Sequence, residues 1–275
     1  MRCRLGDGTR YVGLLMGTDV DVVARLRAAG CVFAEEEAAL LTGAAGNPAE
    51  LDAMVERRAG GEPLEYVVGW AEFCGLRVFV DPGVFVPRPR SEFLVSVAVD
   101  LVRLQGAAEK SVIVDLCCGT GALGLAVAAK AGFSELHAAD LDPAAVACAR
   151  RNVEPVGGHV YQGDLFDPLP SGLRGRIDVL ICNAPYVPTT EIAFMPAEAR
   201  EHEALMALDG GADGLATLRR AAASAGEWLA PGGVLLVETS ERQAPSMAGV
   251  MSAAGLDARI HSDDESGATV VAGAK

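Results

Sequence analysis

The sequence predicts an α/β protein in which a doubly wound, mostly parallel sheet follows a small helical domain and a hairpin. From residue 112 onward, short apolar runs alternate with helical patterns, the order typical of a parallel sheet. A glycine-rich turn joins the first of these runs to a helix. Before residue 59, apolar residues recur instead at helical spacing.

The composition is that of an acidic, globular protein. The chain has 275 residues and a formal net charge of −14, which argues against direct binding to nucleic acid. Its seven cysteines include no Cys-x-x-Cys pair, so neither a disulfide framework nor a zinc ribbon is indicated. We expect a cytoplasmic monomer that holds no metal and does not enter a membrane.

The first part of the chain predicts helices. Residues 1–17 show no clear period and read as a tail or an irregular lead-in. Further on, Leu26 falls in a helical pattern, and Asn47-Pro48 has the form of an N-cap followed by proline at the first helical position. We place a helical domain at residues 1–62. The alternative is that these helices pack on the core and carry no chemistry.

Residues 63–90 predict a β-hairpin that links two domains. Tyr66–Gly69 and Leu76–Val80 read as extended segments, and a turn signal follows the second. Arg88 stands between two prolines on stiff backbone, which either aims it at an anion or makes a simple surface hinge. The remaining residues, 91–275, form the α/β domain.

The first strand of that domain ends in the glycine-rich turn. Gly119 and Gly121 allow a tight turn and close approach to a ligand, while Gly124 permits close helix–strand packing. Asp115 lies at the end of the strand, where its carboxylate either accepts from a ligand amine or caps the next helix. Asp140 closes the next strand, where a ribose-binding acid is expected. Dinucleotides and S-adenosylmethionine both fit this pattern.

A later strand, residues 178–182, ends in Asn183-Ala-Pro-Tyr186. A carboxamide both donates and accepts hydrogen bonds, and a proline has no N–H, so backbone carbonyls stay free as acceptors. The ring of Tyr186 offers a face for a flat group. Together these residues suit an amide or an aromatic amine. The alternative is an ordinary strand-ending turn.

The other segments complete the sheet and surround its edge. Asp164 and Phe166 follow a strand and either receive an adenine or form an exposed turn. Residues 188–212 read as a lid or as a solvated acidic face. Right-handed crossovers place the glycine-rich turn and Asn183 on the same edge of the sheet.

Taken in order, these motifs resemble the HemK/PrmC-type protein-glutamine methyltransferases. The matching segments are Gly61–Tyr66, Val86–Pro89, Asp115–Gly121, Gly163–Phe166, Asn183–Tyr186 and Gly210–Leu215. The resemblance implies a seven-stranded Rossmann-like sheet, S-adenosyl-L-methionine as cofactor and a helical substrate-recognition domain. It further implies methylation of a glutamine side-chain amide in a protein, namely a peptide chain release factor.

The resemblance also implies roles for individual residues. It assigns catalysis to Asn183, Pro185 and Tyr186. It assigns substrate binding to the same three residues together with Ala184 and Arg88. The cofactor residues are Asp115, Cys117, Gly119, Thr120, Gly121, Asp140, Leu141, Asp164, Leu165 and Asn183.

Two departures from the family pattern concern the acceptor. Ala184 stands where the family has a proline, and Arg90-Ser91 replaces an acidic residue and threonine. These changes leave open a paralogue that methylates another planar amine, on adenine or a small molecule. A non-catalytic protein with a cofactor fold and an NAD-dependent enzyme are the remaining alternatives.

Overall fold

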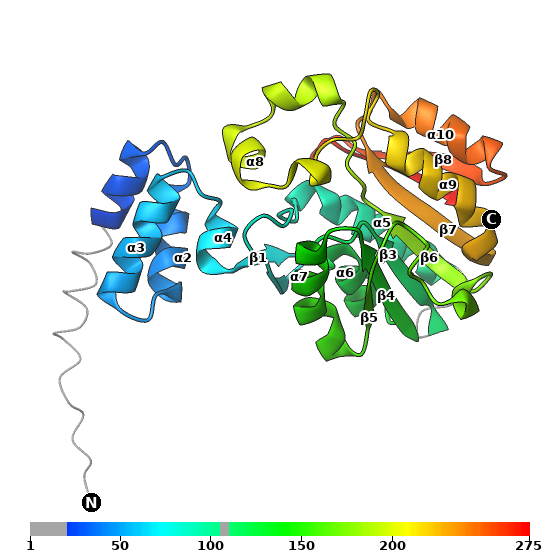
Figure 1. Cartoon of the computed structure of the whole chain (residues 1–275), viewed down its shortest axis with the longest axis horizontal. Coiled ribbons are helices and arrows are strands. Elements are labelled where there is room, and N and C mark those ends of the chain that lie inside the picture. The colour runs from blue at the N-terminus through cyan, green and yellow to red at the C-terminus, as the bar shows by residue number, and fades with distance from the viewer. Residues whose placement is uncertain (1–20, 105–109) are drawn as a thin grey trace, which may run out of the picture. The chain divides into compact units, whose positions relative to one another are not determined.

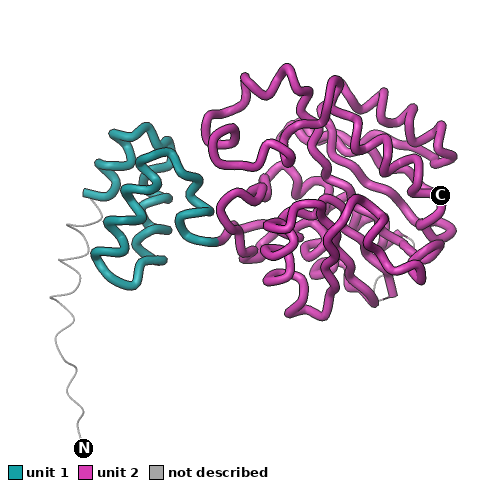
Figure 2. The backbone as a smooth tube through the Cα atoms, viewed as in Figure 1, with its two compact units in different colours: residues 1–69 teal, residues 70–275 magenta. Residues whose placement is uncertain are grey.

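The computed structural model describes residues 21–104 and 110–275, so the tail predicted at residues 1–17 lies outside the described part. The chain divides into two compact units, residues 1–69 and 70–275 (Figure 2). Within the described residues, the first unit is helical and the second holds both sheets. No helix in the described ranges is both long and apolar enough to cross a membrane.

The first unit is a small bundle with its own core. It contains a helix over residues 21–28, followed by α2 (Ala34–Ala44), α3 (Pro48–Ala59) and α4 (Leu64–Val68). The predicted cap is confirmed, because the Asn47 side chain accepts a hydrogen bond from the Glu50 backbone N–H at 2.9 Å. Leu26, Leu41 and Val55 are fully buried in the core of this bundle.

One predicted strand is wrong. Tyr66–Gly69 was expected to be extended, yet Tyr66 and Val67 lie in α4. Pro63 precedes this helix and Gly69, with φ +80°, ends it in the left-handed conformation that favours glycine. Val67 is buried in the helical core, so packing within the unit favours the helix. The hairpin begins later, and its strands are β1 (Trp70–Phe73) and β2 (Leu76–Phe79).

The large sheet confirms the predicted seven-stranded Rossmann-like fold. Its strand order is β5-β4-β3-β6-β7-β9-β8, with β9 antiparallel to both of its neighbours (Figure 1). The strands are β3 (Val112–Leu116), β4 (Glu135–Asp140), β5 (His159–Gln162), β6 (Ile177–Cys182), β7 (Leu229–Thr239), β8 (Asp257–Asp263) and β9 (Ala268–Ala274).

Helices cover both faces of this sheet (Figure 1). One core contains residues of α5 (Glu92–Leu104), α6 (Ala122–Ala131) and α7 (Pro143–Val153). The opposite core contains residues of α9 (Ala216–Trp228) and α10 (Ala244–Ala253). Shorter pieces are α8 (Ala197–His202) and the 3₁₀ turns Pro89–Ser91, Glu154–Val156, Ser171–Leu173, Thr189–Phe194 and Leu205–Ala207.

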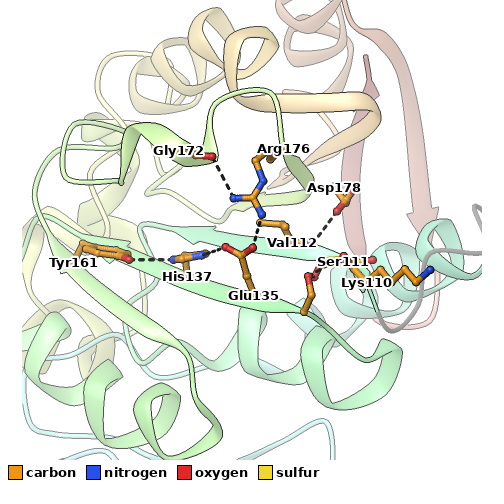
Figure 3. Close-up of polar contacts among 10 residues, drawn as sticks. Lys110, Ser111, Val112, Glu135, His137, Tyr161, Gly172, Arg176 and Asp178 are labelled. Atoms are coloured by element: carbon orange, nitrogen blue, oxygen red, sulfur yellow. Dashed lines mark hydrogen bonds and ion pairs between the residues drawn. The ribbon is translucent and has the colours of Figure 1, made fainter.

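The strand order creates a switch point between β3 and β6. The chain runs outward from β3 to β4 and β5 on one side, and from β6 to β7 on the other. Ligands of open α/β sheets bind at such a point, beyond the carboxyl ends of the strands. The opposite edge carries a polar network around Glu135, His137 and Arg176 (Figure 3).

Candidate active site

A cavity of about 540 Å³ opens at the switch point, within the usual range for small-molecule sites. Its walls come from the segments after β3, β4, β5 and β6, from the segment before α5 and from residues 195–209. Twelve of the predicted site residues line it: Arg88, Cys117, Gly119, Thr120, Asp140, Leu141, Asp164, Leu165, Asn183, Ala184, Pro185 and Tyr186. Asp115 and Gly121 do not.

Asp115 lies beneath the glycine-rich turn. It is fully buried, and its Oδ2 accepts a hydrogen bond from the Gly124 N–H at 2.9 Å, so the carboxylate caps the start of α6. Burial raises the pKa of Asp115 to about 7. The close packing predicted at Gly124 is confirmed, since a Cβ there would lie only 2.9 Å from the Asp115 Cβ.

Asp140 is hydrogen-bonded to the glycine-rich turn. Its Oδ2 accepts from the Gly119 N–H at 2.8 Å, and its Oδ1 accepts from the Asp142 N–H at 2.9 Å. Burial raises the pKa of this carboxyl group. Each oxygen keeps a further lone pair for a ligand hydroxyl or amine. A Cβ at Gly119, where φ is +55°, would meet no atom within 4 Å, so the bare backbone leaves this space to a ligand.

Residues with a strained backbone conformation also lie at the cavity. Among described residues other than glycine, positive φ occurs at Cys74, Cys117 and Leu165. Cys117, at +54°, and Leu165, at +47°, both line the cavity and both belong to the predicted cofactor set. Such conformations cost about 1–3 kcal/mol and cluster at ligand sites.

Asp164 has a partner that sequence reasoning missed. Its Oδ2 lies 2.5 Å from Nη2 of Arg220, which comes from α9 and also lines the cavity. The pair leaves Oδ1 of Asp164 as the acceptor for a ligand amine. Arg220 lies 56 positions from Asp164 and directly follows another arginine, Arg219, so no sequence signal distinguished it.

The Asn183–Tyr186 segment forms the opposite wall. Parallel pairing of Leu116 with Cys182 brings the ends of β3 and β6 together. In the described part of the chain, the Asn183 carboxamide has no hydrogen-bond partner, so it is available to a ligand. The predicted Gly210–Leu215 motif packs behind this segment, where a Cβ at Gly214 would lie 2.2 Å from the Tyr186 carbonyl oxygen.

Tyr186 is held by residues that sequence reasoning missed. Its hydroxyl donates to Oε1 of Glu238 at 2.8 Å, and its carbonyl accepts from Nε2 of Gln243 at 2.9 Å. Arg90 Nε lies 3.0 Å from the same Glu238 oxygen. The available signal was an acid that follows the apolar run Val234–Val237 at the end of a strand.

Arg88 pairs with a buried acid from the predicted lid. Its Nη2 donates to Oε1 of Glu203, whose side chain is fully buried. The Val86 N–H points at the same oxygen at 3.4 Å. Since Arg88 also lines the cavity, this ion pair joins residues 195–209 to the segment before α5.

Comparison with known proteins identifies the family. The methyltransferase small domain model matches residues 76–213. A release factor glutamine methyltransferase from Streptomyces coelicolor is 42% identical over 69% of this chain and 67% of its own length. A 4-amino-L-phenylalanine/4-methylamino-L-phenylalanine methyltransferase from Streptomyces pristinaespiralis is 36% identical over 73% of this chain and 69% of its own.

The comparison with solved structures bears on the fold. A methyltransferase from Pyrococcus furiosus aligns with a TM-score of 0.55 at 15% identity, and the alignment covers 80% of this chain and 98% of that one. This agrees with the sheet topology described above. The chain therefore belongs to the release factor glutamine methyltransferase family and is an S-adenosylmethionine-dependent methyltransferase.

Proposed function

We propose that this protein methylates the side-chain amide nitrogen of a glutamine in a peptide chain release factor. One observation carries the proposal: the β3–β6 pairing puts the glycine-rich turn and the free carboxamide of Asn183 on one cavity. The names of its relatives supply the substrate class. The helices of residues 1–62 would contribute to recognition of that protein, residues 63–90 would link them to the α/β domain at residues 91–275, and residues 188–212 would form a lid.

Different residues of the predicted cofactor set would bind different parts of the cofactor. Cys117, Gly119, Thr120 and Gly121 form the turn, with Asp115 beneath it. Asp140 would accept from ribose hydroxyls, with Leu141 beside it, and Asp164 and Leu165 would receive the adenine. When bound, S-adenosylmethionine supplies an electrophilic methyl group.

The acceptor residues have to orient a poor nucleophile, because the lone pair of an amide nitrogen is delocalised. Asn183 Oδ1 and the Ala184 carbonyl would accept the two amide N–H bonds and raise the electron density on nitrogen. Pro185 and Tyr186 would shape the pocket around the amide plane. Catalysis is then positioning and electrostatic stabilisation, and the surplus proton leaves to water.

Ala184 is compatible with this role. It keeps the backbone carbonyl that the mechanism uses, and it is buried, with 1% of its surface exposed. Packing of Gly210 against Pro185, where a Cβ would lie 2.6 Å from the Pro185 carbonyl oxygen, restricts the segment from behind. Neighbouring packing would thus supply stiffness that a second proline gives in the family pattern.

We further propose a cytoplasmic monomer that does not bind nucleic acid directly. The formal net charge of −14 supports this, because phosphate contacts require a positive surface. Release factors act in the cytoplasm, so the proposed substrate and the proposed location agree.

The test is transfer of labelled methyl from S-adenosylmethionine to unmethylated release factors, with the modified residue located by mass spectrometry. 4-Amino-L-phenylalanine serves as the control acceptor, since a relative of similar identity carries that substrate in its name. We expect label on a release-factor glutamine and none on the amine. Label on the amine alone would replace the proposed substrate with a small aromatic amine.

The variant Asn183→Ala tests the mechanism within the same assay. We expect turnover to fall by about 100–1,000-fold, as for loss of one preorganised hydrogen-bonding group, with cofactor affinity kept within about threefold. Near-normal turnover in Asn183→Ala would rule out the amide clamp.

A further inference from the structure

Glu238 is a buried carboxylate at the end of β7. It follows the apolar residues Val234–Val237, and only 2% of its surface is exposed. A charged side chain is rarely buried to this degree unless specific partners hold it. Burial raises its pKa, and its Oε2 has no partner in the described part of the chain. The position of this acid therefore calls for an explanation beyond packing.

Glu238 interacts with Tyr186, Arg90 and the buried Ser91, and the first two of these partners meet at one aromatic ring. Its Oε1 accepts from the Tyr186 hydroxyl at 2.8 Å and lies 3.0 Å from Nε of Arg90. The Arg90 guanidinium carbon lies 5.5 Å from the centroid of the Tyr186 ring, within cation–π range. Both Arg90 and Tyr186 line the cavity, whereas Glu238 does not. Glu238 thus acts on the cavity wall from behind.

The backbone of Tyr186 is fixed independently. Nε2 of Gln243 donates to the Tyr186 carbonyl at 2.9 Å and to the Asp213 carbonyl at 2.8 Å. Oε1 of Gln243 accepts from the Ser240 N–H at 3.1 Å, so the amide has one orientation. Gln243 fixes the backbone of Tyr186 but not the rotation of its side chain. The hydrogen bond from the hydroxyl to Glu238 fixes that rotation and therefore the direction of the ring.

We propose that Glu238 is a positioning residue for methyl transfer: it fixes the Tyr186 ring and the Arg90 guanidinium that face the acceptor. This inference rests on the proposed function, because it assumes an acceptor beside Tyr186. Misplacement of a positioning wall by a fraction of an ångström lowers the population of productive geometry. Loss of Glu238 therefore affects the acceptor and leaves the cofactor end, on the other side of the cavity, unchanged.

The arrangement also predicts that the protein folds without Glu238. Arg90 is half-exposed, so its charge remains solvated when the carboxylate is removed. Removal of a buried acid with one unsatisfied oxygen also relieves a desolvation cost. Glu238→Gln is the conservative variant, since a carboxamide oxygen still accepts from the Tyr186 hydroxyl. Thr239→Val is the matched control, because this buried neighbour loses only a hydroxyl with no partner in the described residues.

The experiment is a double-mutant cycle between Glu238→Ala and Tyr186→Phe, with kcat and KM measured for the protein acceptor. We expect each single variant to lower kcat/KM by about tenfold or more, and the double variant to match Glu238→Ala, since that variant already removes the hydrogen bond that Tyr186→Phe removes. Cofactor Kd stays within about twofold in all variants, Glu238→Gln recovers part of the loss, and Thr239→Val retains wild-type values.

The outcomes distinguish failure of the positioning role from failure of the proposed function. If Glu238→Ala matches Thr239→Val, or if its effect multiplies with that of Tyr186→Phe, the positioning role is wrong. If the wild-type protein transfers no methyl to release factors, the proposed function fails, and fluorotyrosine NMR then tests the positioning separately. The chain has four tyrosines, and Tyr186→Phe assigns the resonance. A Tyr186 signal that does not change in Glu238→Ala overturns the role, and one that shifts supports it.

Discussion

The two edges of the large sheet differ in how their acidic residues are paired and buried. At the amino edge, Glu135 pairs with Arg176 and lies near His137, while Asp178 accepts from the Val112 N–H at 2.8 Å (Figure 3). At the carboxyl edge, Asp115 and Glu238 are buried, and each keeps an oxygen without a partner in the described chain, as does the buried Glu203 of residues 195–209. The acids of the amino edge are paired. At the carboxyl edge, the unpaired oxygens lie behind the cavity wall, and the acids that line the cavity, Asp140 and Asp164, keep acceptor capacity for a ligand.

The pKa shifts follow the same division. The hydrogen bond from Arg176 lowers the pKa of Glu135, while burial raises the pKa of Asp115, Asp140 and Glu238. A lowered carboxyl pKa gives stability that is lost as the pH falls through the folded-state value. A raised one gives stability that is present in acid and lost as the pH rises. The two edges should therefore respond to pH with opposite sign.

The largest expected effect comes from Asp115. Its folded pKa of about 7 exceeds the ordinary value of 3.8, so the folded state holds a proton that the unfolded chain has lost across that interval. We expect the free energy of unfolding of wild type, relative to Asp115→Asn, to fall by roughly 3 kcal/mol between about pH 5 and pH 8. Urea unfolding at both pH values measures it. An unchanged difference would mean that Asp115 is ionised throughout.

The contrast between the edges also predicts that substitutions at the carboxyl edge weaken cofactor binding and that substitutions at the amino edge do not. In Asp140→Ala, the Gly119 and Asp142 N–H groups lose their acceptor and the glycine-rich turn loosens. We expect the Kd for S-adenosylmethionine to rise by about 30–100-fold, measured by calorimetry. Glu135→Ala at the amino edge is the control and should leave the Kd unchanged. Equal effects of the two variants would remove the functional distinction between the edges.

How much of the fold and of the candidate site could be predicted from the sequence depends on how far apart the interacting residues lie in the chain. The turn at Gly119 and the Asn183–Tyr186 segment carry their chemistry in a few adjacent residues, and the alternation of strands and helices placed both on one edge. Arg220 lines the cavity, and Glu238 and Gln243 hold its wall at Tyr186. Each of the three lies more than 50 positions from the residue that it holds there. Their roles depend on side-chain packing that no local pattern encodes. At α4, local β-branched composition was misleading, because burial and the flanking Pro63 and Gly69 decided the structure.

A smaller effect is expected at the ion pair between Arg88 and Glu203. Glu203 is buried and accepts from both Arg88 and the Val86 N–H, so Glu203→Gln weakens the attachment of residues 195–209. We expect amide hydrogen exchange in that segment to speed up by about tenfold, with a loss of about 1–2 kcal/mol in local stability. Glu201→Gln, an exposed acid in the adjacent short helix α8, is the control. Unchanged exchange in Glu203→Gln would show that this contact does not hold the segment.

The smallest effect belongs to the amino edge. Arg176 and Glu135 are both partly exposed, so solvent screens their attraction. We expect Arg176→Gln to cost about 0.5 kcal/mol of unfolding free energy at neutral pH, and nothing at an acidic pH below the lowered folded-state pKa of Glu135, where this carboxyl is protonated. Urea unfolding at the two pH values measures this, with Arg103→Gln as the control, because Arg103 is exposed and has no partner among the described residues. Because Asp115 is predicted to lose stability as the pH rises and Glu135 to gain it, a deficit in Arg176→Gln that grew in acid would contradict the division between the two edges.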